Sequence, residues 1–319
     1  MDKKKEMVFN LNNFLLAFAD FFDSKKRAYI SLNIAIELNY DDRKLADIIA
    51  LALAYDLGLE ALESFAFLDK NILKDKDVLE IVDFSNKLVL NNEFNKNSIN
   101  NKKVILEFID KSSCNEDIKN VLIELISKVS FHLDLENSNE IVLFIYSKLN
   151  DFTTVLKFED ILKMSMKFNS FVEKDSKIVE KAELLANYFE FEHKDKELFK
   201  IASSLQNIGK LALCNDKNKN NFNIYPYYTK IALSQIMQFD DIVKLCKNVE
   251  ERLDGSGLFN LEAKDLSFKD RLLISLVFYN NLLKEDLNHE EIISNMKKEA
   301  KLGKIDESIV DIFDKLFIN

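Results

Sequence analysis

The residues best placed to do chemistry lie between 250 and 259, where the chain reads Glu-Glu-Arg-Leu-Asp-Gly-Ser-Gly-Leu-Phe. Three carboxylates and one guanidinium stand here beside two of the chain's five glycines, Gly255 and Gly257. Glycine is needed where φ must be positive or where backbone segments approach closely, so this D-G-S-G turn predicts a defined local geometry. Glu250 and Glu251 could bind a cation weakly, although two neighbouring glutamates are more typical of a solvated face.

The D-G-S-G turn resembles the centre of the HD-GYP family of metal-dependent cyclic-dinucleotide phosphodiesterases, whose signature reads roughly H-H-E-x-W-D-G-x-G-Y-P. The resemblance covers roughly residues 160–285. Two-metal phosphoesterases bind the phosphate oxygens, activate a water and stabilise the departing alkoxide with a pair of cations. Several imidazoles and carboxylates from different helices must converge to hold that pair.

The resemblance implies that every ligand position of the family is altered in this chain. Lys174, in Lys-Asp-Ser-Lys-Ile, stands at the first histidine, and Gln206-Asn207 replace the His-Asp pair within Gln-Asn-Ile-Gly-Lys. The other ligand positions fall on Tyr225, Val249, Glu250 and Val277. A lysine about 4 Å from a cation would be repelled by roughly 4 kcal/mol at an effective dielectric near 20. The resemblance therefore implies no catalytic residues, no bound metal and no cofactor.

What remains at these positions supports two interpretations. Lys210 and Arg252 match family positions near the metal centre or the bound phosphates, and either could meet an anion through charge-assisted hydrogen bonds. With Asp254, Gly255 and Gly257 they form the candidate anion site. The alternative is that the last three residues only shape a turn. Leu258-Phe259 stand where the family has Tyr-Pro, which weakens the case for cyclic-dinucleotide recognition.

The elements that must position these residues are predicted to be helices. The chain has one proline, no tryptophan and few glycines, whereas strand-rich folds need frequent Gly and Pro turns. Apolar residues recur at helical spacing, as in the buried face predicted for Ile178, Val179, Ala182, Leu185, Ala186 and Phe189. The predicted fold class is all-α.

An internal repeat with an offset of 151 residues predicts two HD-like helical bundle domains in tandem, 1–150 and 151–319, with a boundary near 149–152. The matching pairs include Tyr55 with Gln206, Asp56 with Asn207 and Gly58 with Gly209. In the first copy, Asp23 and the Tyr55-Asp56 pair occupy the ligand positions. We expect Tyr55 and Asp56 to form a buried hydrogen-bonded pair.

Bulk properties exclude several other functions. A net charge of −10 argues against a broad nucleic-acid surface. The longest apolar stretch is too short to span a bilayer, and the N-terminus lacks a signal-peptide core, so we expect a cytoplasmic protein.

Three histidines, His132, His193 and His289, are expected to be surface or packing residues. Three cysteines, Cys114, Cys214 and Cys246, are expected to be small buried residues in a reducing compartment.

The sequence thus favours a catalytically inactive HD-GYP-like protein, a regulatory or scaffold module that binds a partner protein, a cyclic dinucleotide or another anionic ligand. One alternative is a residual metal-dependent phosphohydrolase that uses carboxylates such as Asp56, Glu250 and Asp254. It predicts a cleft in which at least three carboxylates converge. A third interpretation is a helical domain pair that forms a homodimer through exposed apolar helix faces.

Overall fold

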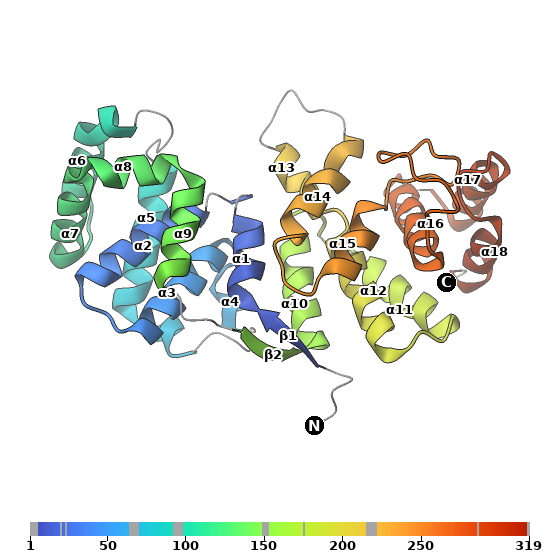
Figure 1. The fold of residues 1–319 in the computed structure, drawn as a ribbon, viewed down its shortest axis with the longest axis horizontal. Coiled ribbons are helices and arrows are strands. Elements are labelled where there is room, and N and C mark those ends of the chain that lie inside the picture. Colours follow the sequence, from blue (N-terminus) through green and yellow to red (C-terminus); the bar gives the residue numbers. More distant parts are fainter. Residues whose placement is uncertain are drawn as a thin grey trace. The chain divides into compact units, whose positions relative to one another are not determined.

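The computed structural model describes residues 6–19, 21–22, 24–63, 70–91, 98–148, 153–174, 176–214, 222–285 and 287–317 (Figure 1). Asp23, Asp175 and the predicted boundary segment 149–152 lie outside these ranges. Helices make up most of the described chain, and the sheet found there is one pair of short strands, so the all-α fold class is confirmed. No helix in the described ranges is long and apolar enough to cross a membrane.

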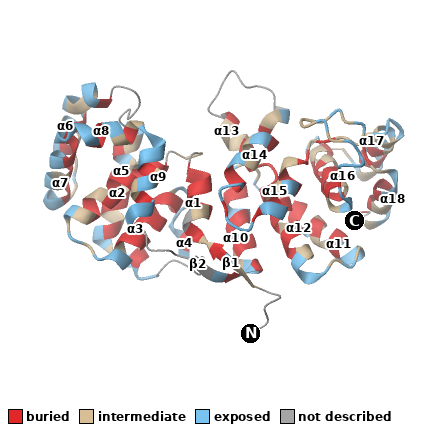
Figure 2. Ribbon diagram, viewed as in Figure 1, coloured by how far each residue is buried: buried red, intermediate tan, exposed pale blue. Residues whose placement is uncertain are grey.

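The fold divides into two compact units, which we call the N-terminal unit (Asn10–Thr154) and the C-terminal unit (Met1–Phe9 with Val155–Asn319). That each of them is an HD-like domain remains a prediction. In Figure 2 the buried residues follow the inward faces of the helices within each unit, as the helical periodicity of the apolar residues requires.

The N-terminal unit is built around α2 (Ser24–Glu37), which packs against α3 (Asp42–Ala54), α5 (Lys76–Asn91) and α9 (Ser138–Lys148). The other elements are α1 (Leu11–Ala19), the short helix η1 (Tyr55–Leu57), α4 (Leu59–Glu63), η2 (Ile72–Lys74), η3 (Ser98–Asn101), α6 (Lys102–Lys111), α7 (Glu116–Ser127) and α8 (Val129–Glu136). His132 of α8 is buried against Ser98 Oγ and the carbonyl of Ile126, so it is a packing histidine, as expected.

The predicted Tyr55–Asp56 hydrogen bond is wrong. The Tyr55 hydroxyl donates to Asp83 at 2.9 Å, and Asp56 is instead paired with the buried guanidinium of Arg27. Arg27 also donates to the carbonyl of Ala52 at 2.7 Å. A buried guanidinium needs acceptors on several sides, and no local pattern predicts that α2 directs one toward Asp56.

The two strands are β1 (Glu6–Asn10) and β2 (Thr153–Lys157), and most of each belongs to the C-terminal unit. Its helices are α10 (Phe158–Asn169), α11 (Ile178–Tyr188), α12 (His193–Leu205), η4 (Ile208–Lys210), α13 (Leu211–Cys214), η5 (Phe222–Ile224), α14 (Tyr225–Leu233), α15 (Asp240–Lys247), α16 (Phe268–Leu283), α17 (His289–Lys301) and α18 (Glu307–Leu316). The central helix α12 packs against α10, α11 and α15. The predicted buried face of α11 is confirmed for Ile178, Val179, Ala182, Leu185 and Ala186, whereas Phe189 caps the end of the helix and is only half-buried.

Local sequence explains where the helices that frame the site begin. Ser267 and Asp270 form a capping box that starts α16, each side chain bonding the other residue's backbone N–H. Pro226 stands in the first turn of α14, where its missing N–H costs no helical hydrogen bond. The first of α14's residues is Tyr225, and Asp270 at the start of α16 also accepts a hydrogen bond from Asn248 at 3.0 Å.

The cysteines agree with the expectation only in part. Cys246 is fully buried, whereas Cys114 is half-exposed and borders a surface cavity with Glu80 and Phe108. Burial and the nearby Glu80 carboxylate raise the pKa of the Cys114 thiol to about 12. The side chain of Cys214 lies outside the described part of the structure.

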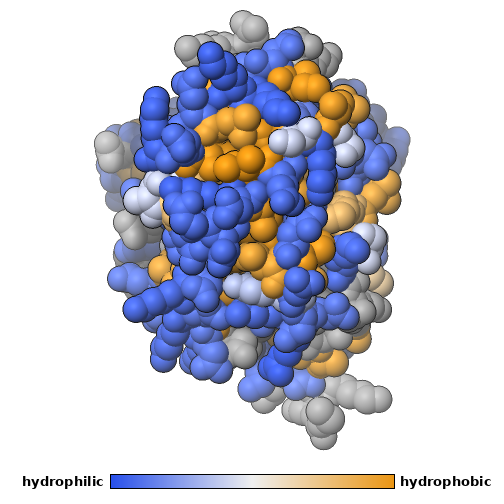
Figure 3. All heavy atoms as spheres, turned by 90° about the vertical axis from the view of Figure 1, so that its left-hand side faces the viewer, coloured by the Kyte–Doolittle hydropathy of each residue, from blue (hydrophilic) through white to orange (hydrophobic). Residues whose placement is uncertain are grey.

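Exposed apolar side chains occur on several helices of the N-terminal unit. The view from the side of α6 and α7 shows apolar patches separated by hydrophilic residues (Figure 3). The large exposed apolar residues on the helices of this unit include Leu90, Val104, Ile123, Val129, Leu133 and Leu143. A homodimer formed through apolar helix faces would bury such residues. The homodimer interpretation remains a prediction.

Candidate functional site

Tyr225 lies at the centre of the candidate site. Its side chain is buried at the start of α14, and its hydroxyl lies 2.9 Å from Oε1 of Glu250 and 3.3 Å from Oε1 of Gln206. Burial, reinforced by the negative charge of Glu250, raises the pKa of Tyr225 well above its usual value. The phenol therefore stays protonated and donates to the oxygens around it. Three predicted positions, Gln206, Tyr225 and Glu250, meet through this one hydroxyl.

Asn207 takes part in a second set of contacts, centred on a residue that the sequence analysis missed. Its amide donates to Glu173 at 3.1 Å, and Glu173 also accepts bonds from Asn280 at 3.2 Å and Lys284 at 2.7 Å. Burial pushes the pKa of Glu173 up, but the bonds from Lys284 and Asn280 outweigh it and leave the pKa below its usual value. Glu173 is therefore ionised at neutral pH.

Helical spacing could have pointed to two of these missed residues. Asn280 follows Val277 on α16 by three positions, and Lys284, which caps the end of α16, follows it by seven, so the helical spacing places all three on one face. Glu173 stands directly before Lys174, the position that the resemblance selected. The sequence alone gave no reason to prefer Glu173, because a carboxylate in a connecting segment is usually solvated.

The two predicted cations are already engaged by side chains of the site. The ammonium of Lys210 lies 4.7 Å from the centre of the Tyr225 ring, and burial together with Lys284 lowers its pKa. Arg252 lies 3.7 Å from Glu250, donates to the carbonyl of Glu251 and covers the ring of Phe278. These contacts satisfy cation–π and ion-pair geometry without any added ligand.

The remaining ligand positions do not contribute polar groups. Val249 and Val277 are buried apolar residues with exposed fractions of 1% and 2%. Lys174 is exposed, and its side chain has no contact in the described part with the residues around Tyr225. The site therefore combines polar side chains from η4, α14, α16 and the Glu250 segment with an apolar floor.

The D-G-S-G turn owes its glycines to two different constraints. Gly255 has a φ of +80°, which residues with a Cβ rarely adopt. At Gly257 a Cβ would lie 2.5 Å from Cα of Glu251, so only glycine permits this approach. Asp254 is exposed and accepts bonds from the N–H and hydroxyl of Ser256. These contacts describe the turn, and the anion-binding role of the three residues remains a prediction.

Glu251 explains why the turn folds so closely, and it corrects the expectation of a solvated glutamate pair. Its carboxylate is fully buried and accepts backbone N–H bonds from Phe259 at 2.7 Å and Leu261 at 2.8 Å. Such bonds supply the compensation that a buried carboxylate requires. Glu251 thus binds the part of the loop that contains Phe259 and Leu261. Gly257 has no Cβ, so the loop can pass close to Glu251.

The donor set does not fit a two-metal centre. Such a centre needs imidazoles and carboxylates free to coordinate, whereas here the phenol is protonated, Gln206 and Asn207 are neutral, and both Glu173 and Glu250 face in-chain cations. No group of three or more His, Cys, Asp or Glu side chains in the described ranges is arranged to hold a metal ion. The carboxylates of the hydrolase alternative are engaged separately: Asp56 with Arg27, Glu250 with Tyr225 and Asp254 with Ser256.

One family model matches part of the chain. A family model described as HD domain matches residues 158–309, which span α10 to the start of α18. No curated protein matches the chain, and no solved structure does. The family match supports an HD-domain family for this part of the chain, and with it a phosphohydrolase-type fold.

Proposed function

We propose that the HD-type region is a non-catalytic regulatory or scaffold module that binds a partner protein or an anionic nucleotide. The observation that carries this proposal is the hydroxyl of Tyr225, which bonds Glu250 beside Gln206, at positions where the HD-GYP resemblance expects metal ligands. These three side chains bond one another without a metal ion.

Electrostatics support the same proposal. Two carboxylates, Glu173 and Glu250, face three cations, Lys210, Arg252 and Lys284. In-chain cations thus supply positive charge of the kind that metals supply in a phosphoesterase, and the three of them balance Glu173, Glu250 and the neighbouring buried Glu251. A divalent cation placed beside Lys210 would be repelled by its ammonium, whereas an anion there would be attracted.

Lys210 is the cation through which an anionic nucleotide would be bound. In the described ranges it has no ion pair, and its burial makes the charged form costly. An anion near its ammonium would relieve that cost and raise its pKa. We therefore expect a bound phosphate or cyclic dinucleotide to raise the melting temperature of the protein, and Lys210→Met to abolish that rise.

The HD-domain match keeps residual phosphohydrolase activity as the second candidate. A hydrolysis assay with cyclic di-GMP and with bis(p-nitrophenyl) phosphate, in the presence of Mn²⁺ or Fe²⁺, separates the two. The non-catalytic module predicts no turnover above a Tyr225→Ala control. Turnover that is removed by a chelator and restored by metal would establish the hydrolase instead.

A further inference from the structure

A groove of about 950 Å³ lies in the C-terminal unit beside β1 and the N-terminal ends of α12 and α15. Its lining includes Glu6, Met7 and Val8 of β1, Leu198 of α12, and Asp240 and Asp241 of α15. None of these residues belongs to the polar cluster around Tyr225. The volume is at the upper end of what small-molecule sites offer, so an extended peptide segment fits it.

The groove runs along an edge of β1. Successive residues of a strand point to opposite faces, yet Glu6, Met7 and Val8 all border the same space. A space that touches three consecutive residues of β1, and none of whose described lining residues belongs to β2, lies on the side of β1 away from β2. In the described part of the chain the sheet consists of β1 and β2, so the other side of β1 has no strand beside it.

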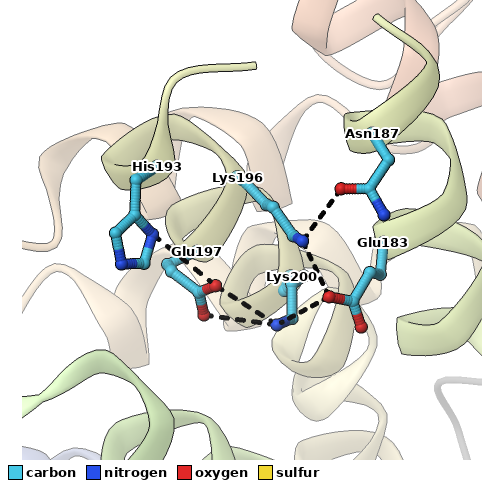
Figure 4. A network of polar contacts seen from close by, with 6 residues as sticks. All are labelled: Glu183, Asn187, His193, Lys196, Glu197 and Lys200. Atoms are coloured by element: carbon cyan, nitrogen blue, oxygen red, sulfur yellow. Dashed lines mark hydrogen bonds and ion pairs between the residues drawn. The ribbon is translucent and has the colours of Figure 1, made fainter. Parts of the chain in front are cut away.

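The groove is acidic. Glu6, Glu192, Asp240 and Asp241 line it, and Lys194 is the one lysine or arginine among its described lining residues. Lys196 and Lys200 of the same helix face away from it, because they bond Glu183, Asn187 and Glu197 in the network between α11 and α12 (Figure 4). His193, at the end of that network, lies 3.9 Å from Glu197. The carboxylates of the groove thus keep most of their negative charge.

The groove also offers apolar contact. Val8 is 42% exposed although it lies on a strand, and Leu198 and Phe158 form part of the groove wall. A strand edge with an exposed branched side chain and no lysine is a site at which another strand can pair. The carboxylates that line the groove favour a positively charged strand, because like charges across an interface are disfavoured.

We propose that an extended, lysine- or arginine-rich segment of a partner protein pairs as a strand with the open edge of β1. Main-chain hydrogen bonds would supply affinity, and Asp240 and Asp241 would receive alternate basic side chains. This proposal gives a chemical class to the partner protein of the module proposed above. It rests on the proposed function only in assuming that the module binds a partner.

The test uses the full chain and a fluorescein-labelled peptide, Lys-Val-Lys-Val-Lys-Val-Lys, with fluorescence anisotropy as the readout. We expect saturable binding that weakens as salt rises, and no binding of the matched Glu-Val peptide. Asp240→Asn with Asp241→Asn should weaken binding by about 2- to 30-fold, the range expected for two exposed ion pairs. Absence of binding by the basic peptide, or equal binding of both peptides, would overturn the proposal.

A matched control variant is Glu116→Gln with Asp117→Asn. That pair is likewise exposed and lies in the first turn of α7, as Asp240 and Asp241 lie in the first turn of α15. Both double variants lose the same favourable interaction between acidic side chains and a helix N-terminus. Comparing them therefore distinguishes the loss of groove contacts from a loss of helix stability. The control should bind the basic peptide as the wild type does, and an equal loss of affinity in both variants would contradict the assigned site.

Strand pairing has its own signature. N-methylation of alternate peptide residues removes the N–H groups from one side of an extended chain and leaves those on the other side. Of two peptides methylated in opposite phase, one should lose binding and the other should keep it. Equal affinities of the two would overturn pairing with β1. Since neither result depends on metal binding or hydrolysis, failure here is distinguishable from failure of the non-catalytic module.

Discussion

The hydroxyl of Tyr225 lies 2.9 Å from Oε1 of Glu250, and the tyrosine side chain is buried. In the HD-GYP resemblance these are two metal-ligand positions, contributed by α14 and by the segment after α15. A direct hydrogen bond joins them here. The Tyr225 phenol stays protonated and is therefore a neutral donor to Glu250. The Glu250 carboxylate also forms an ion pair with Arg252. The account of the site depends on this bond.

Tyr225→Phe removes the hydroxyl and keeps the ring. We expect the free energy of unfolding to fall by about 1–3 kcal/mol, because the part-buried Glu250 carboxylate and the buried Gln206 amide both lose a partner. Urea titration measures the change. Tyr227→Phe, on the same helix but 47% exposed, is the control and should stay within about 0.5 kcal/mol of wild type. Equal stability of Tyr225→Phe and wild type would show that the bond contributes nothing.

Gly58 and Gly209 are equivalent in the internal repeat, yet they meet different constraints. Gly58 has a φ of +82° with open space around it, whereas a Cβ at Gly209 would lie 2.2 Å from the backbone oxygen of Tyr225. We expect Gly58→Ala to cost about 1–2 kcal/mol through backbone strain. Gly209→Ala should cost more, because η4 and α14 must separate and the bond from the Gly209 N–H to Thr229 is lost. Thermal unfolding of both variants ranks them, and the reverse order would contradict this explanation.

Glu251→Gln tests the support of the D-G-S-G loop. The carboxylate accepts two backbone N–H bonds, and a glutamine amide can accept only through its single oxygen. We expect a loss of about 1–3 kcal/mol and faster amide hydrogen exchange at Phe259 and Leu261. Glu262→Gln, at an exposed position, provides the reference. Unchanged exchange at both amides would mean that Glu251 does not hold the loop.

The lowered pKa of Glu173 predicts that the contribution of this residue to stability is lost in acid. Its pKa in the folded protein lies below the ordinary value of 4.5, so the unfolded chain binds this proton more tightly. The stabilisation is therefore fully present above pH 4.5 and is lost as the pH falls through the folded pKa. Wild type should lose stability more steeply than Glu173→Gln between about pH 5 and pH 3.5. Glu180→Gln, an exposed change on α11, should keep the wild-type slope.

The sequence predicted much of the architecture because helical periodicity is a property of local spacing. The buried face of α11 follows directly from apolar residues three and four apart, and the scarcity of glycine and proline indicated helices throughout. The strands β1 and β2 were not predicted. Their pairing joins residues far apart in the chain, and five residues are too few to give an alternating pattern that stands out.

The site was predictable only where the resemblance supplied positions. Gln206, Tyr225 and Glu250 were selected and do meet, but their mutual bonding depends on tertiary geometry. Glu173 was missed because its partners, Asn280 and Lys284, come from a helix more than a hundred residues away. Burial of Glu251 was missed for a similar reason, since nothing in the sequence shows that the Gly257 limb folds back over it.

The most direct test of the proposed non-catalytic role is the metal content of the protein. The chain should be purified, incubated with an excess of Mn²⁺ or anaerobic Fe²⁺, passed through a desalting column and measured by plasma mass spectrometry. We predict well under one equivalent of metal per chain, because Lys210, Arg252 and Lys284 already neutralise Glu173 and Glu250. Two retained equivalents, lost on substitution of Glu173 or Glu250 by alanine, would contradict the account.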